Sequence, residues 1–227
     1  MKTQVFDIPI VNPELDYYQR NEVSNSDLGW LHDELYPKDK FIDPTSAYRF
    51  GNLFDAMVTE SWRINYSSRK CDNEVFLPEE FDLADEMRKA FLKDDTCRMM
   101  ADNSTPQAIF IKKVLFQLDN GFEYSLNMRC KFDLWMDAFG WGGDLKSTTA
   151  TTYEQFLAAI KHFNYDRQRA VYMTLAGSDQ DMLIGVSKKN LKVFKVPIKK
   201  GDALYNSGMQ KMEDLTFKYW QLFGDAA

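Results

Sequence analysis

The feature that most constrains this chain is a strict alternation of apolar and polar residues between positions 122 and 134. Every second position is apolar: Phe122, Tyr124, Leu126, Met128, Cys130, Phe132 and Leu134. A period of two is that of a β-strand with one buried face. The alternation therefore predicts a long strand, and it places Asp133 on the polar face near the strand's end.

A second strand is expected just downstream. The glycine cluster Gly140, Gly142 and Gly143 predicts a tight turn that leads into a strand containing Asp144-Leu145-Lys146. Residues two apart on a strand point to the same side, so Asp144 and Lys146 share one face and Leu145 points to the other. If the two strands pair through this turn, two carboxylates and an ammonium group converge on one side of a sheet.

The rest of the chain alternates between helical and strand patterns. Strands are expected at Phe110–Leu118, Met182–Val186 and Leu191–Val196. In the first half of the chain, one helix is expected to follow the cap Ser26-Asp27 and to end near Pro37, a second to follow a cap at Thr45 and Ser46, and a third to run from Pro78 to about Leu92. In the second half, helices are expected around Tyr153–Ile160, from about Tyr165 to Leu175, and from about Ala203 to Phe223. This order predicts an α/β fold with a central mixed sheet. We expect one domain, 1–227, with a mainly helical part at 1–105 and the sheet with its helices at 106–227.

Composition limits the class of protein. Apolar and aromatic residues make up 44% of the chain, enough for a sizeable core, and no apolar run approaches the roughly 18 residues that a membrane span needs. The first residues lack the pattern of a signal peptide, so we expect a soluble cytoplasmic protein with no membrane partner. The three cysteines are scattered, which favours buried or incidental thiols over disulfides or zinc.

The net charge of −6 bears on the partner. It argues against a sequence-independent nucleic-acid coat, which is normally basic. It does not exclude an enzyme with a local basic patch, because metal-binding carboxylates add negative charge that the ions neutralise.

The chemistry expected of Asp133, Asp144 and Lys146 follows from their charges. Two close carboxylates repel each other unless a cation lies between them, and oxygen ligands suit Mg²⁺ or Mn²⁺. Such an ion would polarise a phosphodiester and lower the pKa of a bound water. Lys146 would orient or deprotonate the attacking water and offset charge in the transition state.

Taken alone, an Asp-x-Lys tripeptide is a weak signal, since most are solvated strand or turn charges. The stretch Gly142–Thr148 superficially matches a phosphate-binding loop, but it lacks the required glycine before the lysine and the four-residue spacer. No G-x-S-x-G or H-E-x-x-H pattern offers another catalytic centre.

Five stretches in order give the tripeptide a context. The chain resembles the PD-(D/E)XK nuclease superfamily, in its RecB-like branch, and is most similar there to exodeoxyribonuclease VIII, the RecE-type exonuclease of phages and prophages. The stretches that carry the resemblance are Val23–Leu28, Phe50–Ala56, Arg129–Asp133, Gly143–Thr148 and Tyr165–Tyr172, the last similar to the "Y-x-x-Q-x-x-x-Y" helix of that branch.

The resemblance implies a restriction-endonuclease-like core and assigns roles. Asp133 and Asp144 would be metal ligands, the Leu145 carbonyl a further ligand, and Lys146 the catalytic lysine. The family helix usually presents a His or Glu to the metal, whereas this chain has Asp55 there. Asp is an acceptable ligand for a hard cation but shorter, so metal affinity is in doubt at this position, and lost activity is the alternative.

Two further groups have competing interpretations. The resemblance implies that Gln168 and Tyr172, an i,i+4 pair on one helix face, support the site or contact the DNA. Without the resemblance, the two residues fit an ordinary amphipathic helix. Basic residues near the motif would either follow DNA phosphates as a basic track or form the wet face of the sheet; they are Arg129, Lys131, Lys161, Arg167 and Arg169.

These observations predict a Mg²⁺- or Mn²⁺-dependent deoxyribonuclease, an exonuclease at duplex ends in phage or prophage recombination. A single-strand annealing recombinase as partner and a homo-oligomer are expectations from the resemblance. Two alternatives remain at this stage: a DNA-binding or scaffold protein that keeps the fold without turnover, and a structure-specific or restriction-type endonuclease.

Overall fold

The structure is a computed structural model that describes residues 1–10, 15–37 and 43–224. The helices are α1 (Asn25–Leu35), α2 (Thr45–Thr59), α3 (Pro78–Lys93), α4 (Asp95–Asp102), α5 (Tyr153–His162), α6 (Tyr165–Ala176) and α7 (Ala203–Phe223). The strands are β1 (Lys2–Asp7), β2 (Ile64–Asn65), β3 (Lys70–Cys71), β4 (Glu74–Val75), β5 (Thr105–Gln117), β6 (Glu123–Met136), β7 (Trp141–Thr148), β8 (Gln180–Ser187) and β9 (Val193–Lys199).

A six-stranded mixed sheet organises the fold, in the order β1-β5-β6-β7-β8-β9. Every neighbouring pair is antiparallel except β7 and β8, which are parallel. The parallel pair needs a crossover, and α5 and α6 provide it. A small separate sheet, β2-β3-β4, lies between α2 and α3 along the chain. The predicted mixed α/β architecture is thereby confirmed.

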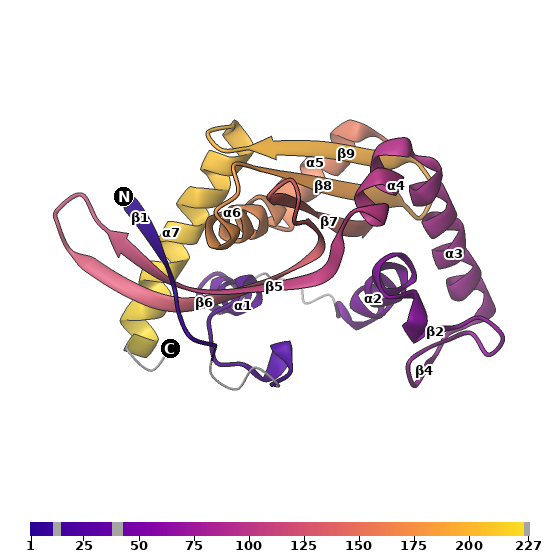
Figure 1. The fold of residues 1–227 in the computed structure, drawn as a ribbon, viewed down its shortest axis with the longest axis horizontal. Helices are drawn as coiled ribbons and strands as arrows, with labels where there is room; N and C mark the ends of the chain where they lie inside the picture. The colour runs from indigo at the N-terminus through magenta and orange to yellow at the C-terminus, as the bar shows by residue number, and fades with distance from the viewer. Residues whose placement is uncertain (11–14, 38–42, 225–227) are drawn as a thin grey trace.

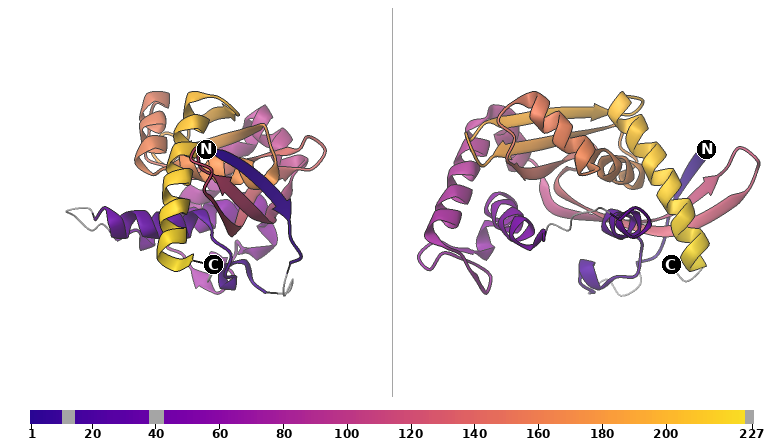
Figure 2. Two further views of the ribbon diagram at one scale, coloured as in Figure 1. Left: turned by 90° about the vertical axis from the view of Figure 1, so that its left-hand side faces the viewer. Right: turned by 180° about the vertical axis from the view of Figure 1, so that it is seen from behind.

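Helices cover both faces of the sheet (Figures 1 and 2). On one face α2, α3 and α4 pack against apolar residues of β7 and β8, such as Leu145, Ile184 and Val186. On the other face α5 and α6 pack against residues of β8 and β9, such as Leu183 and Val196. A third core joins α6 and α7 to the long hairpin β5–β6. The sheet is therefore covered on both sides where β7 and β8 run through the middle.

The alternation between 122 and 134 forms β6, as predicted. Its apolar positions from Tyr124 to Leu134 are all at most 3% exposed. Opposite them, β5 pairs with β6 along almost its whole length, from Thr105↔Trp135 to Gln117↔Glu123. The predicted strand at Phe110–Leu118 is the second half of β5, which begins five residues earlier than expected.

The glycine cluster works differently from the prediction. Only Gly140, with φ +65°, lies in the turn; Gly142 and Gly143 belong to β7. A Cβ on Gly142 would lie 2.5 Å from the Leu134 carbonyl oxygen, and one on Gly143 would lie 2.6 Å from the Met100 side chain. These two glycines are therefore required by close packing of β7 against β6 and α4 rather than by turn geometry.

Helix α1 begins earlier than the sequence suggests, because its cap is Ser24 and not Ser26. The Ser24 hydroxyl accepts from the Asp27 backbone N–H at 3.3 Å, and Asp27 accepts in return from the Ser24 N–H at 2.8 Å, a capping box. Helix α2 begins at Thr45, but its first N–H is held by the Asp43 carboxylate at 3.0 Å.

Within the described residues, no helix is both long and apolar enough to span a membrane.

Candidate active site

The two central strands separate at the point where the acidic residues lie. Pairing between β6 and β7 extends over three residue pairs and stops at Leu134↔Gly143, one step before Asp133 and Asp144. Beyond that point, the Asp133 carboxylate accepts the Leu145 backbone N–H at 2.7 Å, where a strand carbonyl would otherwise accept it. The divergence leaves space between the strands, and the side chain of Asp133 bridges it.

The predicted pair on β7 is in direct contact. The Lys146 ammonium lies 2.5 Å from Asp144 Oδ2, with the Lys146 side chain 19% exposed and Asp144 fully buried. Asp144 Oδ2 is buried, and the Lys146 ammonium is its ion-pair partner. Leu145 points the other way, into the core beneath α2. The alternation along β7 is as predicted.

Asp55 approaches from helix α2 and is held by a residue that the sequence did not single out. The Gln107 amide donates to Asp55 Oδ2 at 3.0 Å and to the Thr59 hydroxyl at 3.2 Å. Gln107 has φ +54° and is skipped in the β5–β6 ladder, where it would face Asp133. The left-handed backbone at Gln107 turns the amide toward α2, while the register on either side, Pro106↔Leu134 and Ala108↔Phe132, is unbroken.

A buried arginine lies behind Asp144. The Arg169 guanidinium is 3.4 Å from Asp144 Oδ1 and 3.4 Å from Asp181 Oδ1, and neither Arg169 nor Asp181 has an exposed side chain. The guanidinium also lies 4.1 Å from the centre of the Tyr172 ring. Arg169 thus connects α6 to β7 and β8 by charge. From the sequence, we expect Arg169 to bind DNA or to support the site. The sequence does not identify Asp181 as the partner of Arg169, because an isolated acidic residue at the start of a strand forms no recognisable motif.

The expected basic track is not formed. Arg129, Arg167 and Arg169 are 6%, 4% and 0% exposed, so their charges face protein groups instead of DNA phosphates. Arg167 donates to Asn25 at 2.9 Å, and Arg129 lies 3.7 Å from Asp27. Of the five residues, only Lys131 and Lys161 are partly or fully exposed. The sequence could not show that α6 is enclosed by α1, α7 and the sheet.

Gln168 and Tyr172 occupy one side of α6, as their spacing predicts. The Gln168 amide lies 3.5 Å from the Tyr172 hydroxyl, a distance at the limit of a hydrogen bond. Tyr172 is 8% exposed and packs edge-on against Phe132, with ring centres 5.2 Å apart. Tyr172 therefore connects this side of α6 to the site, because it contacts Arg169, and Gln168 lies next to the Tyr172 hydroxyl.

The carboxyl groups perturb one another strongly. Burial, together with the charges of Asp55 and Asp144, raises the pKa of Asp133 well above its usual value. Burial and the charge of Asp144 raise the pKa of Asp55 to about 6. Burial alone would lower the pKa of Lys146, but Asp144 and Asp133 outweigh it and raise that pKa. The acids therefore form one electrostatic cluster around the lysine.

Comparison with known proteins agrees with this arrangement. Residues 33–225 match the family described as "PDDEXK-like domain of unknown function (DUF3799)". The chain belongs to this family. Among solved structures, a protein from Eubacterium rectale described as a candidate exonuclease matches with a TM-score of 0.51 at 15% identity, covering 83% of this chain and 71% of that one.

A phage-related exonuclease from Haemophilus somnus 129PT also matches, with a TM-score of 0.39 at 13% identity over 78% of this chain and 83% of that one. At these identities the Eubacterium rectale structure supports the fold, and the nuclease fold of the PDDEXK-like family is confirmed. No curated protein matches the chain in sequence.

The donor groups of this PDDEXK-like domain fit a hard divalent cation. All of them are oxygens, the charge of Asp144 raises the pKa of both Asp55 and Asp133, and the Asp144 carboxylate is buried. Within residues 1–10, 15–37 and 43–224, however, no three His, Cys, Asp or Glu side chains are arranged as a ready-made metal site. The oxygens instead have protein partners: Asp133 accepts the Leu145 N–H, and Asp144 pairs with Lys146 and Arg169.

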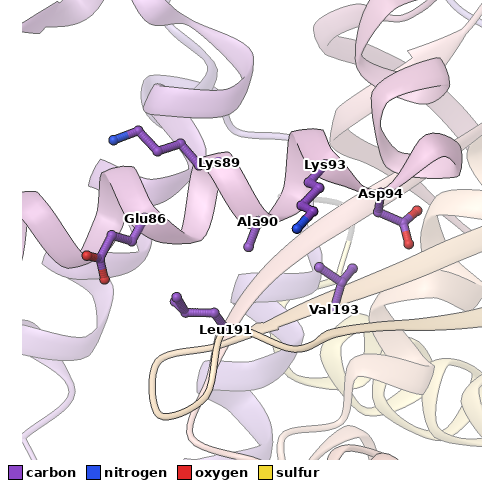
Figure 3. Close-up of a pocket in the computed structure, with 7 residues that line it drawn as sticks. All are labelled: Glu86, Lys89, Ala90, Lys93, Asp94, Leu191 and Val193. Carbon is purple, nitrogen blue, oxygen red and sulfur yellow. The ribbon is translucent and has the colours of Figure 1, made fainter.

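A separate open pocket of about 650 Å³ lies between the end of α3 and the β8–β9 turn (Figure 3). Lys89, Lys93 and Asp94 line it together with Leu191 and Val193. Asp94 is already paired there, 2.6 Å from the Lys195 ammonium. None of the predicted site residues lines this pocket.

The raised pKa values predict an unusual dependence of stability on pH for the metal-free protein. Burial raises the pKa of Asp181 to about 7 and that of Asp55 to about 6, against about 3.9 in an unfolded chain. An acid with a raised pKa stabilises the fold below its unfolded pKa, and this stability is lost as pH rises through the folded pKa. Between pH 5 and pH 8, we therefore expect the melting temperature in EDTA to fall.

The control for this prediction is Asp181→Asn, which removes one titrating group and should flatten the fall. Acids with a lowered pKa, such as Asp94 and Asp85, change the stability only below about pH 4. They therefore do not alter the melting temperature between pH 5 and pH 8. A melting temperature that rises from pH 5 to pH 8 would contradict the prediction.

Proposed function

We propose that this protein hydrolyses phosphodiester bonds of DNA with Mg²⁺ or Mn²⁺, acting as an exonuclease on duplex ends. The observation that carries the proposal is the Lys146 ammonium 2.5 Å from Asp144, beside Asp133, where β6 and β7 diverge. In this proposal, Asp133 and Asp144 hold the metal with the Leu145 carbonyl, and Asp55 takes the place of the usual family histidine. An ion held by these residues would polarise the phosphodiester and would lower the pKa of a bound water.

The residues around the ion have distinct proposed tasks. Because its pKa is raised, Lys146 is protonated at neutral pH in the metal-free site. This favours a role in which its charge stabilises the transition state and orients water, over one in which it accepts a proton. Gln107 holds Asp55 in place, and Arg169 does so for Asp144. Gln168 and Tyr172 act as support beneath them.

The test is hydrolysis of a linear DNA duplex by the purified protein in Mg²⁺, Mn²⁺ or EDTA. We expect fragments in either metal, none in EDTA, and none from Asp144→Ala. Release of mononucleotides from linear DNA with closed circular DNA left intact would identify an exonuclease. If circular DNA is cut, the protein is an endonuclease. If the wild type and Asp144→Ala degrade DNA equally, or neither does so, the assignment fails.

A second candidate is a DNA-binding or scaffold protein that keeps the fold without turnover. The observation behind it is the shorter Asp55, one oxygen of which already accepts a hydrogen bond from Gln107. A Mn²⁺ titration by calorimetry discriminates the two. A competent site binds Mn²⁺ and loses it on Asp133→Ala, whereas a degenerate site binds none in either protein.

The wider setting is proposed on the family resemblance. It comprises a role in phage or prophage recombination in the cytoplasm, a single-strand annealing recombinase as partner, a homo-oligomer, and residues 1–227 acting as one domain. The three cysteines, all free and buried, are compatible with a reducing compartment.

A further inference from the structure

A row of aromatic side chains connects the Lys146 region to the surface at the start of α6. The Lys146 ammonium lies 4.9 Å from the centre of the Tyr165 ring. Tyr165 in turn stacks on Phe163, with ring centres 5.5 Å apart and planes 25° apart. Tyr165 is half-buried, but Phe163 is 58% exposed. The row thus begins at the proposed catalytic lysine and ends at an aromatic face in solvent.

The backbone holds this stack in place. Asn164, between the two rings, adopts the left-handed conformation, with φ 55° and ψ 37°. Asn tolerates this region better than most residues, and the conformation lets residues 163 and 165 stack as neighbours. Phe163 belongs to none of the three cores of the described chain. Phe163 instead packs locally, on Tyr165 and on the neighbouring His162 ring 4.7 Å away, and keeps more than half of its surface in solvent.

Other groups near the stack suit a nucleic acid. Lys161, in the last turn of α5, is exposed two residues before Phe163. Across from α6, helix α2 carries Tyr48, which is 68% exposed and near enough to contribute to the raised pKa of Tyr165, after burial and Asp144. Positive charge combined with exposed aromatic rings is the combination that binds single-stranded nucleic acid, because every base has a π-face.

We propose that the stacked Phe163–Tyr165 pair binds an unpaired nucleobase next to the phosphate that Lys146 faces. The inference deepens the proposed nuclease function and rests on it. A base inside a duplex has both faces stacked, and the terminal base of a blunt end is held in its pair with only the outer face free. An unpaired base at a frayed or overhanging end can instead leave the helix axis and lie on Phe163 beside Lys146. The protein would therefore act on DNA whose terminal nucleotides are separated from the complementary strand.

The experiment is a double-mutant cycle in which one change is made in the protein and the other in the DNA. Wild type and Phe163→Ala are titrated, in Ca²⁺ and with DNA integrity checked on gels, against duplexes with short 5′ or 3′ overhangs. Matched duplexes carry abasic sites at the overhang positions. Stacking on one aromatic residue typically changes affinity by about tenfold. We expect the abasic sites to weaken wild-type binding by about this factor but to leave Phe163→Ala, already weakened, unchanged. Phe163→Trp should bind like the wild type.

The matched control is Phe139→Ala. Phe139 is 61% exposed in the β6–β7 turn, at the opposite end of β7 from Lys146, and its loss should leave affinity unchanged. Equal losses on abasic DNA for wild type and Phe163→Ala would overturn the inference, even if wild type hydrolyses DNA in Mg²⁺. A wild type that neither binds nor hydrolyses DNA would overturn the proposed function as well.

Discussion

Replacing Lys146 by methionine is expected to lower the rate of metal-dependent DNA hydrolysis by about a hundredfold to a thousandfold. A charge placed at the reacting group contributes about 10²–10³ in rate, and a role in proton transfer contributes about 10²–10⁴. Methionine keeps most of the length that packs over Tyr165 but removes the charge. Asp144 keeps the Arg169 guanidinium at 3.4 Å, so the fold should survive. Single-turnover cleavage of an end-labelled duplex measures the effect.

Two comparisons separate this role of Lys146 from a general effect of losing a lysine. Lys195→Met removes a partly buried lysine that is similarly paired, 2.6 Å from Asp94 on the far side of β8, and should keep activity within about twofold of the wild type. Mn²⁺ binding by Lys146→Met should persist, because the carboxylates remain. Full activity in Lys146→Met would remove the basis for the proposed site.

Much of the site could be predicted because its signals are local. The period of two fixed the position of Asp133 on β6, and the spacing within Asp144-Leu145-Lys146 fixed the sides to which these residues point. Sequence could not show that β6 and β7 pair for only three residues before they diverge. The close approach of Gly142 to Leu134 and of Gly143 to Met100 of α4 permits this short pairing, and the second contact joins segments far apart in the sequence.

The elements that were missed depend on distant partners or are short. Strand β1 exists through its pairing with β5, more than a hundred residues away. Helix α4 has eight residues and is set by the Asp94 cap, which accepts the Cys97 N–H at 3.1 Å. Strands β2, β3 and β4 have two residues each, too few for any periodic pattern.

The failure of the basic track has a different cause. Helix α6 carries polar and charged residues on every side, a pattern that is typical of exposed helices. Here their charges are neutralised inside the fold: Arg169 by Asp144 and Asp181, and Asp166 by Lys211 at 2.8 Å. Composition cannot distinguish an exposed charge from one that is buried with its partner, because both use the same residue types.

The same buried charges predict the largest effect on stability. Arg169→Met is expected to lower the free energy of unfolding by about 3–5 kcal/mol at pH 8, the usual cost of removing one member of a buried ion pair. Asp144 and Asp181 would lose the guanidinium that lies 3.4 Å from each. Urea denaturation measures the change. Arg88→Met, which breaks a partly exposed pair with Asp85, should cost about 1 kcal/mol or less.

Two measurements test whether the lost charge causes this decrease in stability: denaturation at a lower pH, and denaturation after a compensating substitution. At pH 5 the loss in Arg169→Met should shrink, because Asp181, whose pKa burial raises to about 7, is then neutral in the folded state. Adding Asp181→Leu should recover part of the stability at pH 8, since an apolar pair of similar volume avoids the unpaired carboxylate. A loss that is equal at pH 5 and pH 8 and is not relieved by Asp181→Leu would show that Arg169 acts through packing against Tyr172 instead of through charge.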